Sequence, residues 1–156
     1  MTVQYTSQLG VAYRADLESL LFFNPGQDRV YHAIMSVIGK YGAPSIVTDG
    51  DHLRVRLEGG RESQTLFALV GEESSLRLAG IMIYTRVDTA TLLILHLAVA
   101  RAFSAHGRHH GQQIALRLIA TLRGLARRIR GTRVLQLIYG GEQPRNIQVI
   151  REGALS

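Results

Sequence analysis

The run Leu92-Leu-Ile-Leu-His-Leu-Ala-Val99 is almost wholly apolar, and a second apolar run, Val134-Leu-Gln-Leu-Ile-Tyr139, follows later in the chain. Between them lie a loop ending in Arg108-His-His-Gly-Gln-Gln113 and a stretch with apolar residues at helical spacing. Strand, glycine-containing turn, helix and strand in this order are typical of a β-α-β unit. The turn places backbone N–H groups at a helix N-terminus, where they can hold a phosphate group.

The helix predicted between the two runs has one apolar face. At ~100° per residue its apolar residues cover an arc of about 140°, and its arginines fall outside that arc. We therefore expect the helix to dock on the sheet with its arginines outward, and Gly131 to end it. The apolar face comprises Ile114, Ala115, Leu118, Ile119, Leu122, Leu125, Ala126 and Ile129. The arginines are Arg117, Arg123, Arg127, Arg128 and Arg130, with Arg133 just beyond.

The segments before Leu92 predict two helices and then a series of strands. Asp16 is expected to cap a first helix, and Asp28 to begin a second helix that Gly42 and Pro44 end. A poor strand signal covers residues 3–9. Clearer strands are predicted at 45–48, 52–58, 65–70 and 76–85, joined by turns such as Asp49-Gly50.

This order of elements predicts the fold class. We expect a mixed α/β fold of the α+β type: an N-terminal helix pair, a mostly antiparallel meander, and one late parallel crossover through the central helix. The chain has 156 residues and is 46% hydrophobic, which suits a single domain over 1–156 with a core of its own.

Composition narrows the function classes. The chain contains no cysteine, which excludes disulfides and thiol catalysis. Its longest apolar run is shorter than the ~20 residues of a membrane span, and its start lacks the pattern of a signal peptide. A cytoplasmic protein is therefore expected. The net charge of +6 favours an anionic partner, although the arginines of the central helix could simply form a solvated face.

Several motifs of this region resemble the GNAT superfamily of acyltransferases. Leu97-Ala98-Val99 is similar to the family's strand ending, and Arg108-x-x-Gly111-x-Gln113 to its R/Q-x-x-G-x-G/A loop. The strand predicted at 76–85 resembles the family's preceding strand. Asn146 resembles the residue that often opens its next helix, and residues 153–155 loosely echo its terminal Gly-Phe. In order of elements the resemblance covers roughly residues 45–155.

The resemblance implies that acetyl-coenzyme A, or another acyl-coenzyme A, is the cofactor. Backbone amides of residues 109–113 would hold its pyrophosphate, because Gly111 lets the backbone approach closely, and Arg108 would add a charge-assisted donor. The pantetheine arm would lie between the two apolar strands. The predicted cofactor-binding residues are Leu97, Ala98, Val99, Arg108, His109, His110, Gly111, Gln112, Gln113 and Asn146.

The sequence also departs from the family pattern. Gln113 stands where Gly or Ala is usual, and a long side chain there could crowd the pyrophosphate or contact it. The chain ends where most members continue into another helix and a strand pair. A neighbouring subunit completing the sheet would protect the open edge, so we expect a homodimer.

The catalytic residues are less clearly marked. The family often places Glu in the first strand and Tyr in the last helix, and neither is present. His96 is the candidate base, with a core histidine as the alternative reading. Tyr139 is the candidate acid, with a strand-end aromatic as the alternative, and Glu142 is a second candidate base on a loop. His106, His109 and His110 lack the partners of a metal site, so no metal is predicted.

Three functions follow as hypotheses. The first is an N-acyltransferase that passes an acetyl group from acetyl-coenzyme A directly to an amine, which must lose a proton before it attacks. The second is a degenerate family member with a regulatory or binding role and no catalysis. The third, a nucleic-acid-binding domain, is the least favoured, because neither an aromatic stacking platform nor a helix-turn-helix pattern is present.

Overall fold

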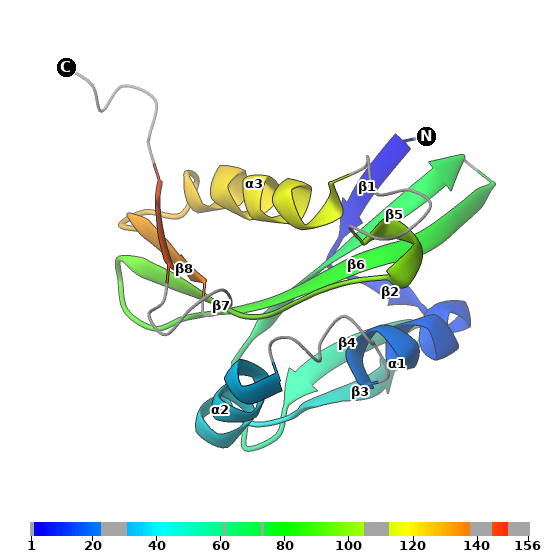
Figure 1. The fold of residues 1–156 in the computed structure, drawn as a ribbon, viewed down its shortest axis with the longest axis horizontal. Coiled ribbons are helices and arrows are strands. Elements are labelled where there is room, and N and C mark those ends of the chain that lie inside the picture. Colours follow the sequence, from blue (N-terminus) through cyan, green and yellow to red (C-terminus); the bar gives the residue numbers. More distant parts are fainter. Residues whose placement is uncertain are drawn as a thin grey trace.

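The computed structural model describes residues 2–22, 31–60, 62–72, 74–104, 113–137 and 145–149. In these residues the strands form two sheets, one ordered β1-β5-β6-β7-β8-β9 and one ordered β2-β4-β3 (Figure 1). The larger sheet consists of β1 Thr2–Thr6, β5 Gln64–Glu72, β6 Ser75–Arg86, β7 Thr91–Val99, β8 Val134–Leu137 and β9 Arg145–Gln148. The smaller consists of β2 Leu9–Gly10, β3 Pro44–Asp49 and β4 His52–Leu57.

The larger sheet has a layer on each face. Helix α3, Ile114–Ala126, covers one face, whereas α1, Arg14–Phe22, α2, Tyr31–Tyr41, and the smaller sheet lie on the other (Figure 1). Side chains of β5 alternate between the two layers, because Phe67 and Leu69 pack toward α1 and Leu66 and Ala68 toward α3. The predicted α+β class, with a mostly antiparallel sheet and helices on it, is confirmed at this level.

The predicted single meander is wrong in one respect, because the strands after α2 are divided between the two sheets. Strands β3 and β4 form the expected hairpin, with Asp49 opposite His52 and the turn at Gly50. Strand β5 does not continue that hairpin but pairs with β1 and β6. The connection contains Gly59 and Gly60, both with positive φ, which turn the chain out of the smaller sheet.

The two N-terminal helices form largely where the sequence predicts them. Helix α1 begins at Arg14, after a 3-10 turn at Val11–Tyr13, so Asp16 lies in its first turn and is not its cap as expected. Helix α2 ends at Tyr41, and Gly42 adopts a φ of +97° as the predicted stop. The predicted start of this helix at Asp28 lies outside the described residues.

Helix α3 confirms the predicted amphipathic face. Ile114, Leu118, Leu122 and Ala126 are buried against the sheet. The helix is shorter than expected, because the N–H groups of Arg128, Ile129 and Thr132 bond to carbonyls three residues back and form tight turns around Gly131. No described helix combines the length and the apolar character that crossing a membrane requires.

Strand β9 corrects the expectation for Asn146. This residue does not open a helix, because residues 145–148 pair antiparallel with β8 and place Asn146 opposite Gln136. Its neighbour Ile147 packs into the core while Asn146 is exposed, the two-residue period of a strand. The outer edge of β8 is therefore paired within the same chain.

Candidate functional site

Strands β7 and β8 are paired in parallel along all the described residues of β8. The register runs from Thr91 opposite Val134 to Ile94 opposite Leu137. Strand β7 continues to Val99 and keeps its pairing with β6 up to Gly80. The part of β7 beyond Ile94 carries Leu97, Ala98 and Val99.

A β-bulge interrupts the register between β6 and β7 at Leu95. Ile94 lies opposite Tyr84 and His96 opposite Ile83, so Leu95 is an extra residue in β7. Leu95 and Ile83 belong to the same core cluster, and residues directly opposite each other share a face of the sheet. Leu95 and His96 therefore both face the layer of α1 and α2. Bulges bend a strand and re-aim its side chains, and they recur next to functional sites.

Gly80 lets the start of α3 pack closely against the sheet near the end of β7. It lies opposite Val99 in the sheet. A Cβ atom on Gly80 would lie 2.8 Å from Ile114 Cγ2, 3.1 Å from Leu118 Cδ1 and 3.2 Å from the Ala98 carbonyl oxygen. Only the absence of a side chain lets the first turn of α3 approach β6 so closely. The structure thus brings the N-terminus of α3 beside Leu97–Val99.

Gln113 occupies the N-cap of α3 in the left-handed conformation, with φ 51° and ψ 48°. Its side chain makes no capping hydrogen bond, and the first turn contains no acidic residue. The positive end of the helix dipole is therefore not offset by a carboxylate within the helix. The left-handed conformation is one that glycine adopts without strain, and Gln113 adopts it at a cost.

His96 is buried, with 3% of its surface exposed. Burial penalises the charged imidazolium and lowers the pKa of His96 from 6.5 to about 4. The imidazole is therefore neutral at pH 7 and a weaker base than an exposed histidine. A general base works best with a pKa near the operating pH.

The low pKa of His96 predicts a pH-dependent stability. Between pH 6.5 and about 4 the unfolded chain protonates this histidine while the folded chain keeps it neutral. The unfolded state then binds more protons, so the free energy of unfolding decreases as the pH falls through this range. Urea unfolding of wild type and His96→Gln at pH 7, 5.5 and 4.5 should give a shallower pH dependence for the variant.

His52 provides the matched control, because it is an exposed histidine on β4. His52→Gln is expected to keep the wild-type pH dependence. Equal pH dependence in wild type and His96→Gln would contradict a neutral, buried imidazole.

The other predicted site residues fall into three groups. Gln113 and the strand Leu97–Val99 are brought together, as described above. Asn146 is separated from them. It lies opposite Gln136, which in turn lies opposite Leu93. Leu93 is about 13 Å from Leu97 along β7, at ~3.3 Å per residue. The remainder lie outside the described residues: Arg108, His109, His110, Gly111, Gln112, Tyr139 and Glu142.

Two further features on the α3 side concern titratable groups. Tyr84 lies beside a cavity of about 270 Å³ that Leu92 and Ile129 also line, and burial raises its pKa. The part of the chain that the structure describes contains no group of three His, Asp or Glu side chains able to hold a metal ion. His106, one of the histidines considered for a metal, is not in that part.

Two residues of the site were not singled out for their roles by sequence reasoning. Gly80 carried a usable signal, because a glycine inside a strand often marks a close approach of another element. Leu95 carried no such signal, because a bulge depends on the register with β6. In the sequence Leu95 is like any other apolar residue of the run.

Comparison with models of known protein families gives no match to this chain, and a search of the curated proteins gives none either. The assignment of a function therefore depends on the residues and geometry described above.

Proposed function

We propose that this protein is an acyl-coenzyme A-dependent N-acyltransferase of the GNAT type that transfers an acetyl group directly to an amine. The observation that carries the proposal is the position of the α3 N-terminus beside Val99, in the strand that carries Leu97, Ala98 and the Leu95 bulge. A pantetheine arm bonded to β7 would extend from the helix N-terminus toward the bulge.

The charge of this region supports an anionic cofactor. Residues 113–137 contain arginines and no acidic residue. The first turn of α3 has backbone N–H groups without a capping side chain from Gln113, and a pyrophosphate held there is favoured by the helix dipole. The motif residues Arg108–Gln112 precede this turn directly in sequence and are proposed to complete the phosphate site.

A second candidate is a coenzyme A-binding protein without catalysis. The environment of His96 favours it, because this buried imidazole is a weak base and β7 contains no carboxylate. In this candidate the cofactor binds at the same part of β7 and is not turned over. The two candidates therefore differ in product formation and not in binding.

Acetyl-coenzyme A is expected to raise the thermal stability of the wild-type protein. A ligand at about a hundred times its dissociation constant stabilises by ~2.7 kcal/mol, which corresponds to about 5–10 °C in Tm for a chain of this size. Differential scanning fluorimetry with and without millimolar acetyl-coenzyme A measures this shift. Gly111→Trp is expected to abolish it, because the indole would occupy the phosphate position.

Gly39→Trp is the matched control, because Gly39 lies on α2 and nothing surrounds its Cβ position within 4 Å. This variant should keep the shift. An unchanged Tm in wild type, or an equal shift in Gly111→Trp, would contradict the cofactor site. Where the shift is present, release of free coenzyme A thiol with a panel of amines distinguishes the candidates: release identifies the enzyme, and its absence favours the binding protein.

A further inference from the structure

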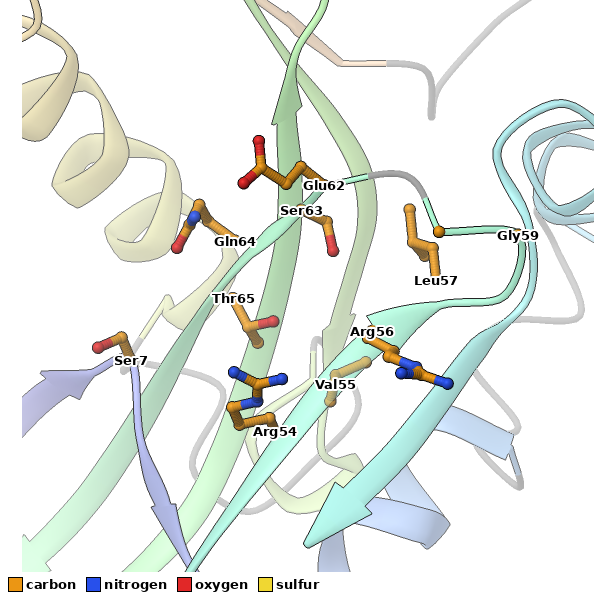
Figure 2. A pocket seen from close by; sticks show the side chains of 11 residues that line it. Ser7, Arg54, Val55, Arg56, Leu57, Gly59, Glu62, Ser63, Gln64 and Thr65 are labelled. Atoms are coloured by element: carbon orange, nitrogen blue, oxygen red, sulfur yellow. The ribbon is translucent and has the colours of Figure 1, made fainter. Parts of the chain in front are cut away.

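A polar slot of about 520 Å³ lies between the two sheets, where β4 and β5 diverge (Figure 2). Arg54, Val55, Arg56 and Leu57 of β4 form one wall, and Ser63, Gln64 and Thr65 at the start of β5 form the other. Ser7 lies where the N-terminal segment passes from the larger sheet to the smaller. The slot is thus a consequence of the division into two sheets and is independent of the site at β7 and the α3 N-terminus.

The β4 wall presents an open strand edge to the slot. The Glu58 N–H donates to the Ala43 carbonyl at 2.9 Å, beyond the β3–β4 pairs. Bonded and non-bonded positions alternate in an antiparallel ladder, so Val55 and Leu57 direct their N–H and C=O groups away from β3. Strand β2 pairs with this edge only as far as Leu53. Among the described residues, no strand pairs with Val55 or Leu57 there.

The β5 wall has an open edge as well. Strand β1 pairs with β5 from Thr2 opposite Gly71 to Thr6 opposite Phe67. Strand β5 begins at Gln64, so residues 64–66 extend beyond the described pairing with β1 while still pairing with β6. Backbone groups of alternate residues in this stretch therefore face the slot. Two open strand edges thus border one cavity.

The charged groups at the slot favour an anionic occupant. Arg54 and Arg56 are exposed on the same face of β4, and Figure 2 shows the Arg54 guanidinium extended toward Thr65. The Arg54 Nε lies 3.7 Å from Asp49 Oδ2, an exposed pair that contributes little. Glu62 also lines the slot, but its carboxylate is directed away from Arg54 (Figure 2).

We propose that this slot binds an extended peptide segment as an added strand on the β4 edge, with acidic side chains at alternate positions opposite Arg54 and Arg56. Strand addition satisfies the open N–H and C=O groups of Val55 and Leu57. Acidic residues two apart in the peptide lie on one face, the face on which both arginines lie, and opposite charges across paired strands attract. The proposal is independent of the acyltransferase function.

The test is fluorescence anisotropy of a labelled hexapeptide, Thr-Glu-Val-Glu-Val-Thr, with the protein free of acyl-coenzyme A. Saturable binding below 1 mM is expected. A peptide with Gln in place of both Glu residues should bind about tenfold more weakly, and Arg54→Gln/Arg56→Gln should lose a similar factor. Both arginines are exposed, so this variant should fold normally, which circular dichroism verifies.

Two controls make the test specific. Arg127→Gln/Arg128→Gln removes the same charge from exposed positions after α3 and should bind the peptide as wild type does. Two further peptides carry backbone N-methyl groups at either the odd or the even positions, and at least one should lose tenfold or more, because N-methylation removes the strand hydrogen bonds. Absence of saturable binding, equal losses in both double variants, or full binding by both methylated peptides would each overturn the proposal.

Discussion

The substitution Gly42→Ala is expected to destabilise the fold by about 3 kcal/mol or more. Gly42 has a φ of +97°, and a Cβ atom there would lie 1.9 Å from the Glu58 carbonyl oxygen. The left-handed conformation costs a non-glycine residue about 1–2 kcal/mol, and relieving the clash by moving backbone adds about 1–3 kcal/mol. In urea or thermal unfolding the variant should lose roughly 6–12 °C in Tm.

The cost is high because the clash involves backbone on both sides. The Glu58 N–H donates to the Ala43 carbonyl and the Gly42 N–H donates to the Ile38 carbonyl, both at 2.9 Å. Relief therefore requires that α2 separate from the end of β4. Gly39→Ala is the matched control, because Gly39 lies within α2 with nothing near its Cβ position, and alanine should stabilise the helix by about 0.5–1 kcal/mol. Similar stability of the two variants would show that the close contact between Gly42 and Glu58 does not fix the end of α2 against β4.

The substitution Leu118→Ala is expected to cost about 2–5 kcal/mol, the range for deleting a buried leucine side chain. Leu118 is 0% exposed and packs among residues of β5, β6 and β7. Its Cδ1 atom fills the space over Gly80, so its removal leaves a cavity beneath the first turns of α3. The free energy of unfolding measured in urea gives the loss.

Leu116 serves as the control, because it lies on the same helix and is 63% exposed. Leu116→Ala should change the stability by no more than about 0.5 kcal/mol. The pair also tests the proposed function: loosening α3 should reduce the Tm shift with acetyl-coenzyme A in Leu118→Ala and leave it unchanged in Leu116→Ala. Equal stability losses would mean that α3 does not dock through the Leu118 face.

The local elements of this fold could be predicted from the sequence because each has its own period. The apolar residues of α3 recur at helical spacing, and His52–Leu57 alternates exposed and buried residues. Glycines with positive φ follow two of the helices: Gly42 ends α2 as expected, and Gly131 closes the turns that follow the end of α3 at Ala126. Such signals depend on residues close together in the chain.

What could not be predicted depends on pairing between distant segments. The division into two sheets arises because β1 pairs with β5 and β2 with β4, and neither short N-terminal strand has a strong pattern. Asn146 was expected in a helix, yet its strand is specified by β8 beside it. The Leu95 bulge is likewise a property of register with β6. Of the candidate site, Leu97–Val99 and Gln113 were proposed from the sequence and lie near each other, whereas the contact of Gly80 with α3 was not predicted.

The N-terminal segment that joins both sheets also has a consequence for the order of folding. The Thr2 hydroxyl donates to the Gly71 carbonyl, 69 positions away along the chain, and Leu9 pairs with Leu53. The β3–β4 hairpin, by contrast, joins neighbouring residues, with Asp49 opposite His52. Ordering so long a loop is slow compared with closing a hairpin. The segment that fastens the two sheets together is therefore expected to be among the last to take its native position.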